Sequence, residues 1–138
     1  MENKYFTPDI EDLCIGYEYE QLINQVWTKE VFAKGSYLPE NIDLLNWIHS
    51  CVLSKKIRVP YLTKEQIEAE GWEFIKHHAG TEWYDFEKDE YSLYVDFDFR
   101  GEIYLKIYSD RYYEEFNYFS GKCKDINTFR KICKLLEI

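Results

Sequence analysis

The chain has 138 residues, 46% of them hydrophobic and 31% charged, which is the composition of a globular domain and excludes wholesale disorder. Acidic residues outnumber basic ones 26 to 17, so the formal net charge is −9. This charge argues against direct binding of nucleic acid through a broad basic face and against adhesion to an anionic membrane. No apolar run is long enough to span a membrane and no secretory signal opens the chain, so we expect a single domain, 1–138, in the cytoplasm.

The first sixty residues predict a hairpin, a helix and a short β-like segment. The expected elements are an extended lead-in over 1–12, strands over 14–23 and 25–32, a helix over 42–53 and a β-like segment over 57–62. A short turn near Asn24 is expected to join the two strands. Pro60 has no N–H to donate to a sheet, so it predicts a sheet edge or the end of a strand.

A short helix over 63–70 carries the clearest local signals. Thr63 at the N-cap, with Gln66 three residues later, is the capping-box pattern. Gly71 follows at the position where a left-handed residue commonly ends a helix. These signals predict a two-turn helix that closes before Trp72.

After this helix the pattern favours strands for almost fifty residues. The expected strands cover 73–78, 82–87, 91–99, 102–108 and 111–119. Ser120 and Gly121 are expected to end the sheet. Short strands that follow one another with brief turns predict an antiparallel meander.

The centre of this meander predicts a hairpin that turns at Arg100 and Gly101, where glycine supplies a positive φ. Apolar and polar residues alternate on both sides of the turn. The inward face would hold Tyr91, Leu93, Val95, Phe97, Phe99, Ile103, Leu105 and Ile107, and the solvated face would hold Ser92, Tyr94, Asp96 and Asp98.

The last segment predicts an amphipathic helix capped by Asp125. Its apolar stripe would consist of Ile126, Phe129, Ile132, Cys133 and Leu136. Laying this stripe on an antiparallel sheet buries both apolar faces. We therefore expect an α+β fold: an antiparallel meander with a short central helix and a C-terminal helix packed on the sheet.

Three stretches resemble a known group of proteins: Tyr5–Glu20, Arg58–Trp72 and Phe119–Leu136. They follow a "TPxIEx…GYEYE" opening, a strand that runs into "YLxKExIExxGW", and a closing "F.G..K.I.ELRKLL" helix. In these features the chain is similar to small uncharacterised proteins carried by phages and mobile elements of Bacteroidota. The resemblance implies a mobile-element setting and an accessory or counter-defence role, without a catalytic motif.

The cysteines predict reduced thiols rather than a metal site. They are Cys14, Cys51, Cys123 and Cys133, and none forms a CxxC pair. Without a secretory signal we interpret them as semi-buried small side chains in the free form. Ligand pairs at short spacing are what zinc needs, so we expect no metal and no cofactor.

No catalytic signature is present, and a non-enzymatic protein is therefore expected. Carboxylates two residues apart on a strand share one face, as in Glu18 with Glu20 and Asp96 with Asp98. Such pairs leave a carboxylate-based hydrolase as a remote alternative. Charge on a solvated sheet face is the commoner explanation.

Segment 82–98 is the most unusual local feature, with seven acidic residues and one lysine, net −6, interleaved with aromatic residues. Exposed Trp and Tyr beside charge are typical of binding surfaces, although a plain acidic sheet face is also compatible. Acidic residues on a strand could imitate a phosphate backbone, and we expect a basic protein surface as partner, such as a nucleic-acid-binding host or defence protein that is inhibited in the manner of anti-CRISPR proteins. The candidate partner-binding residues are Glu82, Trp83, Tyr84, Asp85, Glu87, Asp96 and Asp98.

A second group of tyrosines further along supports an alternative function. Tyrosines on the outer side of a meander can form a shelf on which a base stacks, although cross-strand aromatic pairing is the simpler account. The alternative is a small-ligand binding protein that sequesters a nucleotide-like molecule. Its candidate residues are Tyr104, Lys106, Tyr108 and Arg111.

Overall fold

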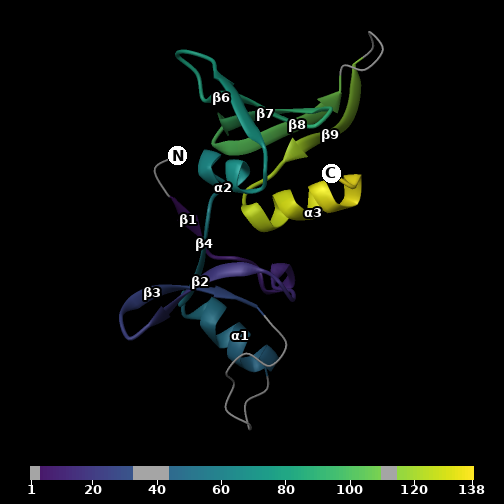
Figure 1. Ribbon diagram of the computed structural model, residues 1–138. Coiled ribbons are helices and arrows are strands. Elements are labelled where there is room, and N and C mark those ends of the chain that lie inside the picture. The colour runs from purple at the N-terminus through teal and green to yellow at the C-terminus, as the bar shows by residue number, and fades with distance from the viewer. Residues whose placement is uncertain (1–3, 33–43, 110–114) are drawn as a thin grey trace. The chain divides into compact units, whose positions relative to one another are not determined.

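The computed structural model describes residues 4–32, 44–109 and 115–138 (Figure 1). The fold is α+β with antiparallel strands and a C-terminal helix, as predicted. The strands form two separate sheets, of four and five strands. The chain divides into two compact units, one within 2–61 and the other within 62–138, here called the N-terminal and C-terminal units. The expectation of one domain stays a prediction.

The N-terminal unit is a four-stranded sheet with one α-helix. Its elements are β1 (Tyr5–Phe6), the 3-10 turn η1 (Ile10–Asp12), β2 (Glu18–Ile23), β3 (Val26–Val31), α1 (Leu44–Leu53) and β4 (Ile57–Pro60). The strand order is β1-β4-β2-β3, so the end of the unit returns to lie between its first two strands. Its core consists of Tyr17, Tyr19, Cys51, Ile57 and Val59.

Local turn chemistry explains where these elements differ from the prediction. The strand expected over 14–23 begins only at Glu18, because Tyr17 N–H donates to the Cys14 carbonyl and Gly16, at φ +89°, closes a turn there. The lead-in over 1–12 is not simply extended, since its described part holds β1 and η1. Cys14 is exposed rather than semi-buried. Pro60 ends β4, as predicted.

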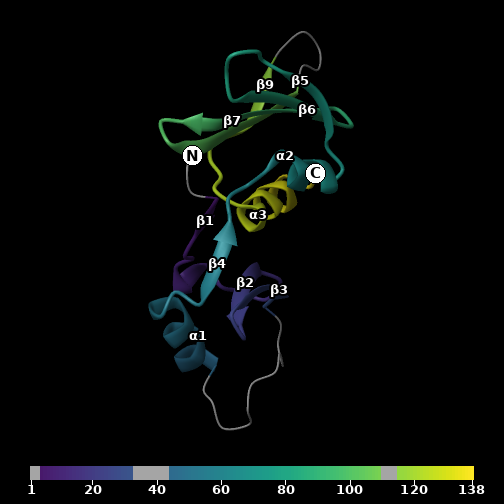
Figure 2. The same cartoon turned by 90° about the vertical axis from the view of Figure 1, so that its left-hand side faces the viewer.

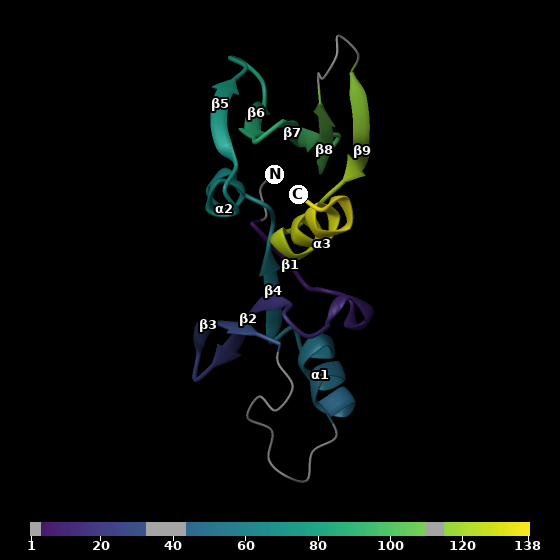
Figure 3. The same ribbon diagram turned by 45° about the vertical axis from the view of Figure 1, so that its right-hand side comes forward.

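The C-terminal unit is a five-stranded meander covered by two helices (Figures 2 and 3). Its elements are α2 (Lys64–Ala69), β5 (Glu73–His77), β6 (Trp83–Lys88), β7 (Tyr91–Phe99), β8 (Glu102–Ser109), β9 (Phe116–Lys122) and α3 (Ile126–Leu136). In both views α2 and α3 lie on the same side of the sheet. The buried core between them includes Trp72, Phe86, Leu93, Val95, Leu105, Ile107 and Phe129, all at most 2% exposed.

The local signals for the helix ends are confirmed. Thr63 Oγ1 accepts from Gln66 N–H, and the Gln66 side chain accepts from Thr63 N–H, so both halves of the capping box form. Gly71 follows at φ +88°. Asp125 Oδ1 accepts from Thr128 N–H at 2.9 Å at the start of α3. These contacts satisfy N–H groups that a helix start leaves without partners.

The predicted hairpin is also confirmed, with Arg100 at φ +54° and Gly101 at φ +80°. The pairing shifts between Asp96 and Phe99, however, and this irregularity alters the faces expected at the strand end. Phe99 is 45% exposed instead of inward. Asp96 is 5% exposed rather than solvated, because its carboxylate is enclosed by hydrogen-bond partners.

The last strand corrects the predicted sheet end. Ser120 and Gly121 lie inside β9, where they pair with Lys106 and Leu105. Glycine suits position 121, because a Cβ there would lie only about 3.1 Å from the Phe119 ring. The strand expected over 111–119 is described only from Phe116, and residues 110–114 lie outside the described part.

Candidate functional site

The face of the five-stranded sheet opposite α2 and α3, called the outer face, brings the two predicted surfaces together. Phe86, Leu93 and Leu105 point to the helix-covered core, so the residues that alternate with them point outward. Cross-strand pairing arranges these outward residues in three rows across β6, β7 and β8. The rows are Trp83–Asp96–Tyr104, Asp85–Tyr94–Lys106 and Glu87–Ser92–Tyr108.

Trp83 is a large and exposed side chain of this face, and a buried carboxylate holds it in place. It is 42% exposed, yet its Nε1 donates to Asp96 Oδ2 at 2.7 Å. Its ring meets Tyr94 edge to face at 6.0 Å and His78 at 6.3 Å between centroids. The other oxygen of Asp96 accepts from the backbone N–H of Asp98 at 3.0 Å. The indole is therefore a fixed, exposed aromatic surface.

The remaining carboxylates of the face are partly compensated. Asp85 Oδ2 lies 2.7 Å from His78 Nε2, and Lys76 is its cross-strand neighbour on β5. Glu87 is exposed, and its cross-strand partner on the neighbouring strand β5 is Glu73, so two like charges face each other there. Burial, followed by the charges of Asp96 and Asp85, raises the pKa of Tyr94 above its ordinary value.

The acidic segment 82–98 does not form one continuous acidic surface. Asp85, Glu87 and Asp96 reach the outer face, whereas Tyr84 lies on the helix-covered side, where it stacks on His77 at 4.3 Å. Glu82 precedes β6 and is exposed. Asp98 accepts from Gly101 N–H and stabilises the hairpin turn. Alternation along the strands therefore distributes the charge in several directions.

The tyrosine shelf shares the outer face, but its lysine is already engaged. Lys106 Nζ forms an ion pair with Glu115 and lies 5.0 Å from the Tyr108 ring centroid. The Tyr104 ring packs against Phe99 at 5.5 Å. Arg111 lies outside the described residues. No described arginine or uncommitted lysine was found on this shelf to hold a phosphate.

The predicted catalytic alternatives acquire structural roles. Glu20 Oε2 accepts from Arg58 Nε at 2.5 Å, while Asp96 and Asp98 bind groups of their own hairpin. Within the described residues, no three His, Cys, Asp or Glu side chains gather where they could hold a metal ion.

All four cysteines are free thiols, and three of them share an environment that disfavours the thiolate. Cys51 and Cys123 are buried and Cys133 is half-buried. Burial raises the pKa of each of these three thiols above its ordinary value. The neutral thiol is therefore the stable form, which is the opposite of a nucleophilic cysteine.

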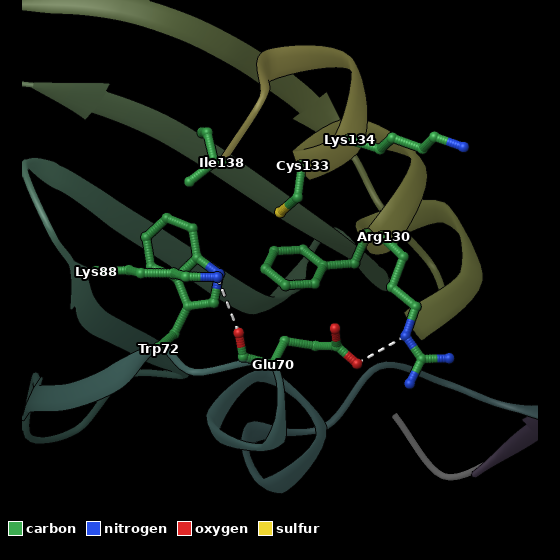
Figure 4. Close-up of a pocket in the computed structure, with 8 residues that line it drawn as sticks. Glu70, Trp72, Lys88, Arg130, Cys133, Lys134 and Ile138 are labelled. Atoms are coloured by element: carbon green, nitrogen blue, oxygen red, sulfur yellow. Dashed lines mark hydrogen bonds and ion pairs between the residues drawn. The ribbon is translucent and has the colours of Figure 1, made fainter.

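Sequence reasoning did not identify a pocket in the C-terminal unit (Figure 4). Trp72, Lys88, Phe129 and Cys133 are among the residues that line it. The stripe on α3 indicated Phe129 and Cys133 only as core positions. Gly71, at φ +88°, ends the helix just before Trp72 but gives no indication of a pocket.

Comparison with protein-family models, curated proteins and solved structures finds no match to this chain. Among the helices of the described ranges, none has the length and apolar character needed to cross a membrane.

Proposed function

We propose that this chain is a non-enzymatic interaction protein that binds a basic protein surface through its outer face. The observation that carries this proposal is Trp83, which is 42% exposed and fixed by its hydrogen bond to Asp96. Tryptophan is enriched among the residues that dominate binding energy at interfaces. A side chain that is immobilised before binding loses little conformational entropy when a partner covers it.

The charges around Trp83 favour a basic partner. Glu73 and Glu87 are exposed neighbours on the outer face, and no described residue forms an ion pair with either of them. Lys76 is the cross-strand neighbour of Asp85, and His78 Nε2 meets the same carboxylate at 2.7 Å. With a net charge of −9, the chain attracts a positively charged surface over a Debye length of about 8 Å at physiological salt.

The partner class rests on this chemistry and on the resemblance to phage and mobile-element proteins. Surfaces that carry excess Lys and Arg are typical of nucleic-acid-binding proteins. The resemblance adds the expectation that the partner is a host or defence protein in the host cytoplasm. The chain would then inhibit it in an anti-defence role, by competing with nucleic acid for the basic surface.

A capture experiment with matched variants tests this function. The immobilised chain is incubated with bacterial lysate at low salt, and captured proteins are identified by mass spectrometry. Trp83→Ala removes the anchor, and the double variant Glu73→Lys, Glu87→Lys reverses charge on the outer face. The expected result is capture of a basic nucleic-acid-binding protein that both variants lose, that high salt releases, and that added DNA or RNA displaces.

The control reverses the same number of charges on the helix-covered side of the unit, through Glu65→Lys with Glu137→Lys, both at exposed positions. This control should retain the partner. If both doubles lose it equally, only net charge matters and the outer face is not the binding surface. If Trp83→Ala captures the same proteins as the unmodified chain, the proposal fails.

A further inference from the structure

A pocket in the C-terminal unit lies between the end of α2, the end of β6 and the helix α3 (Figure 4). Its volume is about 270 Å³, far more than a single water needs. Pockets near this size accept small organic molecules. None of its residues belongs to the outer face, so any ligand that it binds is independent of the proposed function.

The wall of the pocket is aromatic and apolar. Trp72 and Phe129 are 2% and 0% exposed, and their ring centroids lie 6.1 Å apart in a tilted arrangement. Cys133 and Ile138 complete the apolar lining. In Figure 4 the Cys133 sulfur points from α3 toward the side of the pocket where Trp72 and Lys88 lie. Both rings are covered in this structure, so a flat apolar group reaches this wall only when the Lys88 side chain moves aside.

Trp72 also carries a hydrogen-bond donor that meets no oxygen or nitrogen acceptor in the described part of the chain, only the weakly accepting sulfur of Cys133. Its Nε1 is buried and makes no hydrogen bond there. The N–H lies near enough to the Cys133 sulfur to favour the thiolate form, without the geometry of a hydrogen bond to the thiol. A buried donor without a partner is rare and needs an explanation, such as a bound molecule.

Lys88 adds a positive charge to the pocket, and no described carboxylate forms an ion pair with it. Its Nζ donates to the Glu70 carbonyl oxygen at 3.1 Å, and this acceptor carries no formal charge. An ammonium has three protons, so two stay available. The Glu70 carboxylate instead accepts from Arg130 Nε at 2.6 Å. Burial outweighs the neighbouring Lys88 and raises the pKa of the Cys133 thiol, which stays neutral and does not offset the ammonium.

We propose that this pocket binds a small organic carboxylate. Its apolar body lies against Trp72 and Phe129, and its carboxylate accepts hydrogen bonds from Trp72 Nε1 and Lys88 Nζ. The flexible stem of Lys88 moves outward to admit the carboxylate to the buried N–H. One inward ammonium matches a single negative charge. A phosphate dianion would need a second one, but Arg130 is engaged by Glu70 and the Lys134 side chain points away from Trp72 (Figure 4).

Nuclear magnetic resonance of the ¹⁵N-labelled chain tests this directly, because each of the 4 tryptophans gives one indole N–H signal. The probes are benzoate, 3-phenylpropionate and indole-3-acetate, with benzyl alcohol and inorganic phosphate as comparison compounds. The expected result is a saturable shift of the Trp72 signal by at least one carboxylate, with a dissociation constant of about 1 mM or lower. The comparison compounds should not shift it at the same concentrations.

Variants assign the binding to the proposed groups. Lys88→Met keeps the length of the side chain and removes the charge, and it should weaken binding at least about tenfold, the equivalent of one charge-assisted hydrogen bond. Lys131→Met removes the same charge from an exposed position of α3 that does not line the pocket, and it should change nothing. Cys133→Leu fills the pocket while keeping its charges, and it should abolish the shift.

The proposal is overturned by any of three results. The first is no Trp72 shift with any of the three carboxylates at about 10 mM in a folded sample, in which case the pocket holds water only. The second is an equal shift with inorganic phosphate or benzyl alcohol. The third is unchanged carboxylate binding in folded Cys133→Leu, or in Lys88→Met if that variant folds.

Discussion

Asp96 is the buried carboxylate on which the outer face depends, and replacing it with alanine measures that dependence. The carboxylate accepts two hydrogen bonds, from Trp83 Nε1 at 2.7 Å and from the Asp98 backbone N–H at 3.0 Å. A hydrogen bond to a charged group contributes about 1.5–3 kcal/mol. Because the Trp83 side chain is 42% exposed and can regain water, we expect Asp96→Ala to lower the free energy of unfolding by about 2–4 kcal/mol rather than the full sum.

A double-mutant cycle isolates the bond between the indole and the carboxylate. Trp83→Phe keeps an aromatic ring but removes the N–H donor, and it should cost about 1–2 kcal/mol. The double variant should cost less than the sum of the two single variants by about 1–2 kcal/mol, since the shared bond is lost only once. The assay is urea unfolding at neutral pH followed by circular dichroism for all four chains.

Asp85→Ala supplies the control on the same face. Asp85 meets His78 at 2.7 Å, but both side chains are about one-third exposed, so this substitution should cost less than about 1 kcal/mol. Additive effects of Asp96→Ala and Trp83→Phe would refute the reasoning. A loss below about 0.5 kcal/mol for Asp96→Ala would do so as well, because surface substitutions typically have that effect.

Local geometry supports three further predictions. Gly101→Ala should lower stability by about 1–2 kcal/mol in thermal unfolding, because φ is +80° and nothing lies within 4 Å of the added Cβ, so the cost comes from the backbone alone. Thr63→Ala should lower it by about 0.5–2 kcal/mol through loss of the capping box, whereas Thr63→Ser should be nearly neutral; equal losses would contradict the cap as the cause. In alkylation followed by mass spectrometry of the folded chain, exposed Cys14 should react first. Buried Cys123 should resist well above neutral pH, because its raised pKa leaves little thiolate until the solution becomes strongly basic, and four thiols should react after denaturation without reductant.

The parts of the fold that sequence reasoning predicted well depend on interactions between residues close in the chain. Thr63 and Gln66 are three positions apart and complete each other's hydrogen bonds. Arg100 and Gly101 set the hairpin through their own φ angles. The errors arise where such a signal was overlooked or overridden. Gly16 turns the chain and delays β2 to Glu18.

The candidate site was only partly predictable, because its residues come together across strands. Trp83 was identified as a candidate, but its hydrogen bond to Asp96 spans thirteen positions and depends on the pairing of β6 with β7. Asp96 was expected on a solvated side, because alternation assigns a face without saying which neighbours cover it. Tyr84 was grouped with Trp83, although adjacent residues of a strand point to opposite faces.

By itself, the sequence determined the α+β class, the helix caps, the hairpin at Arg100 and Gly101 and the net charge of −9. These depend on composition, on periodicity and on contacts within a few residues. Only the tertiary structure decided that the acidic strand and the tyrosine shelf share one face, because strand register brings together residues far apart in the chain. It alone decided that Trp72, Lys88 and Cys133 surround one pocket, since a cavity exists only after separate elements have packed against one another.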